Sequence, residues 1–303
     1  MSKNMENSNA QISKEDLKQF KGRSMGQETM RRLMKNKGAI IGMCFLILLV
    51  IVAIGSEFMF DYDTDITLIQ AENSYAPPSL QHPFGCDQSG RDIFARILYG
   101  SRYSLIIGIG SVAIGLFIGL ILGSLAGFYG GFMDNLVMRA NDILYSIPNI
   151  MIAVVVVSIF GPSTMSLLFS LSISTSSSFA RITRAAVMQV RGMEYVESAY
   201  AMGLPTWKVI LRHIIPNCLS PIIVQVTLAV GNNIISASSL SFLGVGIPVP
   251  LPEWGAMLSE GRNYIRSAPW MCIFPGLAIM LTVLALNLMG DGLRDALDPK
   301  LKR

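Results

Sequence analysis

The stretch Glu194-Tyr-Val-Glu-Ser-Ala-Tyr-Ala-Met-Gly-Leu-Pro-Thr-Trp-Lys-Val-Ile-Leu-Arg-His-Ile-Ile-Pro-Asn217 interrupts a largely apolar chain, and runs long enough to enter a bilayer flank it. Two sets of its residues recur at i, i+3, i+4 and i+7, the spacing of an amphipathic helix. These sets are Val196, Ala199, Tyr200 and Gly203, then Trp207, Ile210, Leu211 and Ile214. Gly203 is placed to end the first helix in a left-handed conformation, and Pro205 suits the first turn of the second. The stretch predicts a helix-turn-helix at a membrane surface.

Composition identifies the chain as an integral membrane protein. Of its 303 residues, 51% are hydrophobic and only 15% are charged, far from the values of soluble domains. The net charge of +4 is too small and too dispersed to indicate nucleic-acid binding. The four cysteines form no CxxC pair, so we interpret them as small buried hydrophobic residues rather than a metal or redox site.

Six segments predict an all-α membrane protein with six transmembrane helices. About 20 apolar residues cross roughly 30 Å of hydrocarbon at about 1.5 Å per residue. The predicted spans are residues 39–60, 103–127, 147–160, 163–180, 218–243 and 270–289. The fourth is rich in serine, so we expect protein to shield it from lipid or an aqueous path to run along it. Close helix packing is an equally good reason for those serines.

The basic residues predict that both termini are cytoplasmic. Cytoplasmic loops of membrane proteins carry an excess of Lys and Arg. With six spans, the outer loops hold only five of the 24 Lys and Arg residues. This topology places the polar stretch in the cytoplasm.

The remaining segments connect the spans. Residues 1–38 are a basic cytoplasmic N-terminal tail, in which the pattern near 25–34 suits an interfacial helix. Residues 61–102 form an extracytoplasmic loop, in which Asp92 is placed to cap a surface helix that begins at Ile93. We expect a core over 103–290, containing five helices and the cytoplasmic loop 181–216, and then a tail over 291–303.

The cytoplasmic stretch resembles the EAA loop of ABC importer permeases. Glu197, Ser198 and Ala199, with Gly203 four residues after Ala199 and Pro216 closing the motif, are in register with that family's pattern. The family has Ala at the place of Ser198. His213 and Ile215 also depart from its usual residues.

Other segments resemble one branch of these permeases, the dipeptide, oligopeptide and nickel importers. They are His-Pro-Phe-Gly-Cys-Asp-Gln-Ser-Gly-Arg-Asp at 82–92, Leu-Ser-Phe-Leu-Gly at 240–244, Pro-Glu-Trp-Gly at 252–255 and Gly-Asp-Gly-Leu-Arg-Asp-Ala-Leu-Asp-Pro at 290–299. The resemblance covers about residues 29–300 and points to the C-type permease subunit.

The resemblance implies a type I importer (MetI-like) fold in a bacterial inner membrane. It implies three kinds of protein partner beside the membrane lipid: a homologous B-type permease, two ATPase subunits and an extracytoplasmic substrate-binding protein. Outer loops 61–102 and 245–269 would meet the binding protein. ATP and Mg²⁺ would be bound by the ATPases, with no cofactor in this chain.

By resemblance, the residues that couple to an ATPase are Glu197, Ser198, Ala199, Gly203, Trp207 and Pro216. Pattern alone leaves a solvated surface open for Glu197 and Trp207.

Polar residues within the apolar spans are candidates for a translocation path. They are Ser174, Asn232, Asn233 and Asn287. Hydrogen bonds between helices are the alternative role for the three asparagines. We interpret Asp134, Arg139 and Asp142 as caps and ion pairs rather than as a proton relay.

Missing motifs limit the function. No GxxxxGK[ST] phosphate loop, catalytic cluster or metal-ligand cluster occurs in the sequence, so we expect a subunit that is not an enzyme. An ATP-driven peptide importer subunit is the favoured interpretation, with nickel or a metal chelate as the alternative cargo. A proton-coupled secondary transporter would need paired carboxylates within the membrane, and none lies mid-span.

Overall fold

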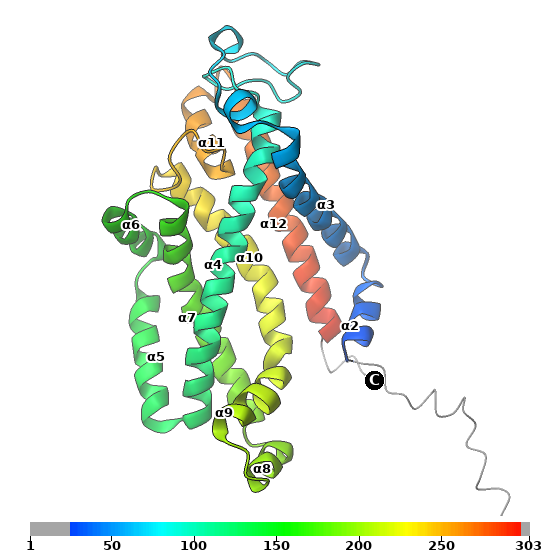
Figure 1. The fold of residues 1–303 in the computed structure, drawn as a ribbon, viewed down its shortest axis with the longest axis vertical. Helices are drawn as coiled ribbons and strands as arrows, with labels where there is room; N and C mark the ends of the chain where they lie inside the picture. Colours follow the sequence, from blue (N-terminus) through cyan, green and yellow to red (C-terminus); the bar gives the residue numbers. More distant parts are fainter. Residues whose placement is uncertain (1–24, 298–303) are drawn as a thin grey trace, which may run out of the picture.

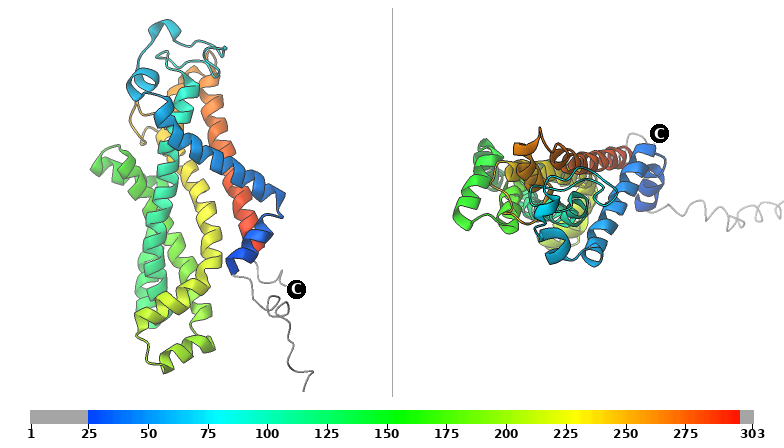
Figure 2. Two further views of the ribbon diagram at one scale, coloured as in Figure 1. Left: turned by 45° about the vertical axis from the view of Figure 1, so that its right-hand side comes forward. Right: turned by 90° about the horizontal axis from the view of Figure 1, so that it is seen from above.

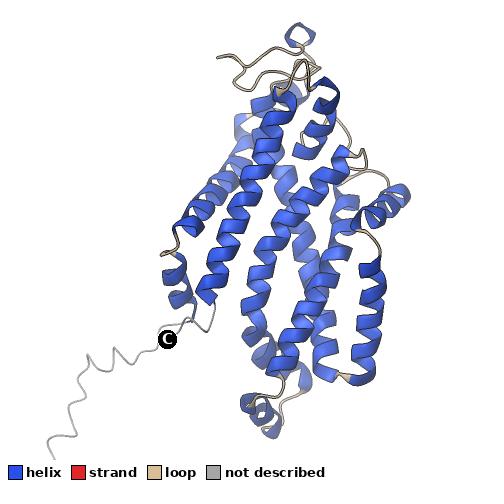
Figure 3. Cartoon of the chain, turned by 180° about the vertical axis from the view of Figure 1, so that it is seen from behind, coloured by secondary structure: helices blue, strands red, loops and turns tan. Residues whose placement is uncertain are grey.

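The computed structural model describes residues 25–297, and within that range the regular structure is helical (Figure 3). The helices are α2 (Met25–Leu33), α3 (Lys37–Met59), α4 (Ile93–Tyr129), α5 (Gly131–Ser146), α6 (Asn149–Phe160), α7 (Thr164–Val190), α8 (Glu194–Ala201), α9 (Thr206–Val209), α10 (Leu219–Phe242), α11 (Trp254–Gly261) and α12 (Trp270–Leu297). Short π and 3₁₀ turns lie at 62–67, 71–73, 210–218 and 262–264. The predicted all-α fold is confirmed.

The long helices run along one axis, with α8 at one end and α11 near the other (Figure 1). These are called the α8 end and the α11 end below. The described chain starts at α2 and stops at the end of α12, and both lie toward the α8 end (Figure 2). Residues 1–24 of the predicted tail, and 298–303, lie outside the described range.

Four helical stretches are long and apolar enough to cross a membrane: Lys37–Met59, Ile93–Tyr129, Thr206–Phe242 and Trp270–Leu297. A fifth arises if α5 and α6, bent by 87° at Ile147–Pro148, form one broken span. A sixth would be α7, whose 27 residues are less apolar because of their serines. The six-span count therefore stays a prediction that depends on α7 and on whether α5 and α6 form one span.

Several predicted boundaries are wrong. The surface helix expected from Ile93 and the span expected at 103–127 are one helix, α4, because no residue between them breaks it. The third span is predicted at 147–160, but α6 has only 12 residues and turns sharply from α5 at Ile147–Pro148. Likewise α12 continues to Leu297, into the expected C-terminal tail.

Glycines bring α4 and α7 into close contact along most of their length. They recur every four residues at Gly115, Gly119, Gly123 and Gly127. A Cβ atom at Gly119 would lie 2.5 Å from Cβ of Phe179. This is the small-residue packing typical of membrane helices. The facing serines Ser170, Ser172 and Ser176 donate to carbonyl oxygens of their own helix at 2.5–2.9 Å, so they add no unpaired donor to this contact.

Candidate functional site

The predicted helix-turn-helix occurs at the α8 end, and its turn is built by Gly203. Gly203 has φ of +76°, a left-handed conformation that costs a side-chain-bearing residue roughly 1–2 kcal/mol. Its N–H donates to the Tyr200 carbonyl at 2.8 Å, and the Leu204 N–H donates to the Ala199 carbonyl at 3.3 Å. These two bonds form the Schellman motif that satisfies the last carbonyls of a helix. The predicted role of Gly203 is confirmed, and Pro205 is the N-cap of α9.

The second half of the stretch is not a separate helix. From Thr206 to Phe242 the chain is one helical run through a π turn at 210–214 and a 3₁₀ turn at 215–218. Pro216 lies inside this join and has no N–H to donate. The Asn217 side chain bonds to the carbonyl of His213 at 2.7 Å. α9 and α10 are therefore parts of one continuous helical run.

One face of this structure is buried and the other is exposed. The buried stripe of the helical run is Ile210, Ile214, Cys218 and Ile222. It turns Trp207 and Leu211 outward, so the predicted apolar face Trp207–Ile210–Leu211–Ile214 is split. In α8, Val196 and Ala199 are buried.

The six predicted coupling residues thus divide by exposure. Glu197, Ser198, Gly203, Trp207 and Pro216 are exposed, whereas Ala199 is fully buried and anchors α8 to the bundle. Met202, Trp207 and Leu211 are 59–71% exposed. Exposed apolar residues of this size beside a carboxylate are typical of a surface that binds another protein. We call the exposed residues Glu197, Ser198, Met202, Trp207 and Leu211 the α8 surface.

Two contacts connect the α8 end to α4. The ring of Tyr200 stacks on Phe128, the second-last residue of α4. The Arg191 guanidinium donates to the carbonyls of Gly127 and Phe128 at 3.0 and 3.3 Å. A cation at this position satisfies the last carbonyls of α4 and opposes its dipole.

Ion pairs hold α5 against α7, as predicted for the carboxylates near this end. Arg184 donates to both oxygens of Asp134, and its Nη2 lies 2.6 Å from Oδ2. Arg181 pairs with Asp142 at 2.9 Å. The contacts are bidentate for Asp134, which fixes orientation as well as distance.

A polar cavity of about 470 Å³ lies between the α5–α6 bend, α7 and α10. Its polar lining residues are Tyr145, Asn149, Ser174, Thr175, Ser178, Gln225, Asn232 and Asn233. Three of the four predicted path residues, Ser174, Asn232 and Asn233, therefore share one cavity. The Ser174 hydroxyl is buried and has no partner among the described residues. None of the described residues that line the cavity is charged.

Asn233 connects three helices at the wall of this cavity. Its Nδ2 donates to the hydroxyls of Ser111 on α4 at 2.7 Å and Thr175 on α7 at 3.0 Å. Asn233 thus makes the hydrogen bonds between helices given as the alternative role and also lines the cavity. Asn232 is exposed.

Asn287 lies apart from the other three. It lines an apolar groove of about 680 Å³ between α10 and α12, beside Ile235, Met280 and Leu284. The structure does not bring it into the polar cavity.

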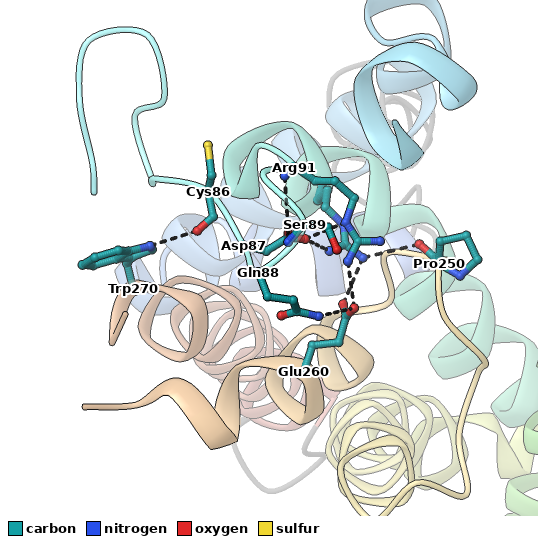
Figure 4. Close-up of polar contacts among 9 residues, drawn as sticks. Cys86, Asp87, Gln88, Ser89, Arg91, Pro250, Glu260 and Trp270 are labelled. Atoms are coloured by element: carbon teal, nitrogen blue, oxygen red, sulfur yellow. Dashed lines mark hydrogen bonds and ion pairs between the residues drawn. The ribbon is translucent and has the colours of Figure 1, made fainter. Parts of the chain in front are cut away.

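At the α11 end, buried ion pairs fix the 82–92 segment onto α11 (Figure 4). Arg91 bonds to Asp87 at 2.7 Å and to Glu260 at 2.8 Å. Arg96 bonds to Asp87 and reaches Glu260 at 3.1 Å. All four side chains are at most 9% exposed. Two cations and two carboxylates balance each other, so the burial leaves no net charge.

Family comparisons identify the class of protein. The sequence profile of binding-protein-dependent transport system inner membrane components matches residues 115–303. The chain belongs to this family. A second profile, the N-terminal transmembrane domain of oligopeptide transport permease C, matches residues 24–78 of this permease. The predicted C-type resemblance is confirmed, and the permease is a multi-pass inner-membrane component.

Named relatives are similar over nearly the whole permease. The dipeptide transport system permease protein DppC of Alkalihalophilus pseudofirmus is 43% identical over 284 residues, covering 94% of this chain and 93% of the relative. The glutathione transport system permease protein GsiD of Pectobacterium atrosepticum is 44% identical over 280 residues, covering 92% and 93%.

A solved structure shares the fold. A chain of the MetNI methionine ABC transporter in an inward-facing conformation superposes with a TM-score of 0.56 at 18% identity. The match covers 67% of this permease and 96% of that chain. The expected MetI-like fold is confirmed.

Sequence reasoning missed the other polar residues of the cavity and the buried ion pairs. Tyr145, Asn149 and Gln225 gave no signal, because the bend after α5 that brings them together was not predicted. Asp87 and Arg91 have i, i+4 spacing, but their partner Glu260 is 169 residues from Arg91.

Proposed function

We propose that this permease is the C-type subunit of an ATP-driven importer of dipeptides or oligopeptides. It pairs with a B-type permease, two ATPases and a substrate-binding protein, and the α8 end faces the cytoplasm. The observation that supports the cargo most directly is the polar, uncharged cavity between α5–α6, α7 and α10.

The chemistry of this cavity matches a peptide backbone. Amides and hydroxyls donate to peptide carbonyls and accept from peptide N–H groups. Because the described lining residues carry no charge, they do not select between acidic and basic side chains of the cargo. The relatives named for dipeptide and glutathione transport agree with this cargo class.

A bare metal cation fits the cavity less well. Ni²⁺ prefers imidazole or other nitrogen and oxygen donors in a tetragonal arrangement. Among the described residues that line the cavity, none is a His, Cys, Asp or Glu. We therefore favour peptides over nickel.

Coupling to ATP hydrolysis takes place at the α8 surface in this proposal. An ATPase binds the exposed Glu197 and Trp207, and its movement reaches α10 through the continuous helix 206–242. At the α11 end, the ion pairs to Glu260 hold the 82–92 segment rigid for the binding protein.

Transport by the reconstituted assembly tests this function. Proteoliposomes with both permeases, the ATPases and the binding protein are expected to accumulate a labelled dipeptide only when ATP is present on the side of the membrane that carries the ATPases. Uptake driven by a proton gradient without ATPases would contradict the proposal. Ni²⁺ uptake with no peptide uptake would contradict the cargo.

The partner at the α8 surface is tested by charge reversal. In this proposal Glu197 faces a basic group of the ATPase. Glu197→Lys is therefore expected to weaken ATPase binding by roughly tenfold or more, because two positive charges then face each other. Glu194→Lys is the matched control, since it puts the same charge on the same helix. Undiminished binding by Glu197→Lys would contradict the proposed contact.

A further inference from the structure

An ion pair joins α3 to α4 on the outside of the bundle. Nη2 of Arg102 lies 2.8 Å from Oε2 of Glu57. The Arg102 guanidinium also lies 5.2 Å from the centre of the Tyr99 ring, which holds it in place. The Glu57 side chain is 60% exposed and that of Arg102 26% exposed. Both charged groups are therefore accessible to a ligand.

The pair lies at the level of lipid headgroups. Residues 38–56 of α3 and 103–128 of α4 carry no charged side chain. At about 1.5 Å per residue, the first stretch is about 28 Å long, close to the hydrocarbon thickness of roughly 30 Å. Glu57 and Arg102 are the charged residues that end these stretches toward the α11 end. They face the headgroup layer of that leaflet.

An apolar groove leads from the ion pair into the membrane. It has a volume of about 510 Å³ and lies between Val50 and Ile54 on α3 and Leu105, Ile106 and Ile109 on α4. Glu57 and Arg102 form its polar end. Ile54 and Ile106 are 64% and 52% exposed, so the groove opens to the surroundings of the bundle. An acyl chain fits there through van der Waals contacts with these apolar side chains.

We propose that this groove binds a phospholipid whose headgroup carries both a phosphate and a primary ammonium, namely phosphatidylethanolamine. Arg102 donates to the phosphate oxygens, the ammonium donates to Glu57, and one acyl chain occupies the groove. The pair favours this headgroup over its competitors. A headgroup with only a phosphate leaves Glu57 facing an anion, and a choline has no N–H to donate.

Lipid binding by the purified full-length chain tests the site. Native mass spectrometry in detergent compares phosphatidylethanolamine, phosphatidylcholine and phosphatidylglycerol with identical acyl chains. Phosphatidylethanolamine is expected to bind roughly 1.4- to fivefold more tightly than phosphatidylcholine, the range for one exposed charged contact. Glu57→Gln is expected to remove this preference. Arg266→Gln, at an exposed arginine of the same end, is the control and is expected to keep it.

A second variant separates the groove from the ion pair. Ile106→Trp fills the groove and leaves Glu57 and Arg102 in place, so it is expected to weaken the binding of all three lipids. Equal affinity for phosphatidylethanolamine and phosphatidylcholine in the unmodified chain would overturn the proposal. So would Ile106→Cys cross-linking to a partner helix in the assembled transporter, because a protein would then occupy the groove. None of these measurements involves transport, so their failure leaves the proposed function intact.

Discussion

The ring of Tyr200 on α8 stacks on the ring of Phe128 at the end of α4, with centroids 6.2 Å apart and planes inclined by 28°. This contact joins α8 to α4, the helix that packs along α7. It is a second connection between the α8 end and the bundle, in addition to the continuous helix 206–242.

Removing this ring is expected to reduce coupling without affecting insertion. An aromatic pair contributes about 0.5–1.5 kcal/mol beyond its buried area. Tyr200→Ala is therefore expected to lower peptide import per ATP hydrolysed by a few-fold in proteoliposomes. Tyr195→Ala, on the same helix and about as exposed, is the control. A Tyr200→Ala permease that matches the unmodified ratio would show that the stack does not transmit the movement.

The glycine contact between α4 and α7 is expected to control the stability of the bundle. Gly119→Ala puts a Cβ atom 2.5 Å from Cβ of Phe179 and 2.9 Å from the Ser176 carbonyl oxygen. Overpacking of this kind costs about 1–3 kcal/mol, so Tm in detergent is expected to fall. Gly55→Ala on α3 has no atom within 4 Å of its new Cβ and is expected to keep Tm. An equal Tm for both variants would contradict close α4–α7 packing.

Removing one partner of the buried ion pairs at the α11 end is expected to destabilise the fold. Glu260→Gln leaves the Arg91 and Arg96 guanidinium groups with one carboxylate, at a cost of about 3–5 kcal/mol for a fully buried pair. Glu72→Gln, at an exposed carboxylate of the loop between α3 and α4, is the control. Thermal unfolding measures the difference. Unchanged unfolding of Glu260→Gln would mean that water screens these charges.

A pH dependence is expected from Glu253, which caps α11. Its oxygens accept from the N–H groups of Gly255 and Ala256 at 2.9 and 2.8 Å. Burial raises the pKa of the Glu253 carboxyl above its ordinary value of 4.5. The folded state then binds a proton more tightly than the unfolded state. Its extra stability is fully present below pH 4.5 and is lost as the pH rises through the folded-state pKa.

The variant Glu253→Gln isolates this effect because it cannot ionise. The Tm of both proteins is measured from pH 4 to pH 8. As the pH rises, the Tm of the unmodified chain is expected to fall relative to that of Glu253→Gln. Parallel Tm curves would show that the pKa of this carboxyl does not differ between the folded and unfolded states.

The sequence predicted those parts of the fold that local chemistry determines. Gly203 ends α8 because a left-handed residue is needed there, and Asp92 caps α4 because its Oδ1 accepts from the Ala95 N–H at 3.0 Å. The glycines at 115, 119 and 123 predicted a packing face by their spacing alone.

What the sequence did not reveal depends on contacts between distant segments. The apolar residues 147–160 looked like a span, but α6 turns by 87° from α5. By its spacing, Trp207 fits an apolar helical face. However, the buried face of the helical run 206–242 is formed by Ile210, Ile214, Cys218 and Ile222, and Trp207 lies outside it. The cavity residues gather only because that bend brings Tyr145 and Asn149 against α7 and α10.

In the proposed mechanism, α8 is a rigid element, ended by Gly203, through which ATP hydrolysis drives import. Gly203→Pro tests it, because proline cannot adopt φ of +76° and has no N–H for the Tyr200 carbonyl. Gly203→Asn is the control, since asparagine tolerates a left-handed conformation. The measurement is peptide imported per ATP hydrolysed by the reconstituted transporter. We predict near-zero import with continued hydrolysis for Gly203→Pro and a ratio close to the unmodified value for Gly203→Asn. An unchanged ratio for Gly203→Pro would contradict the account.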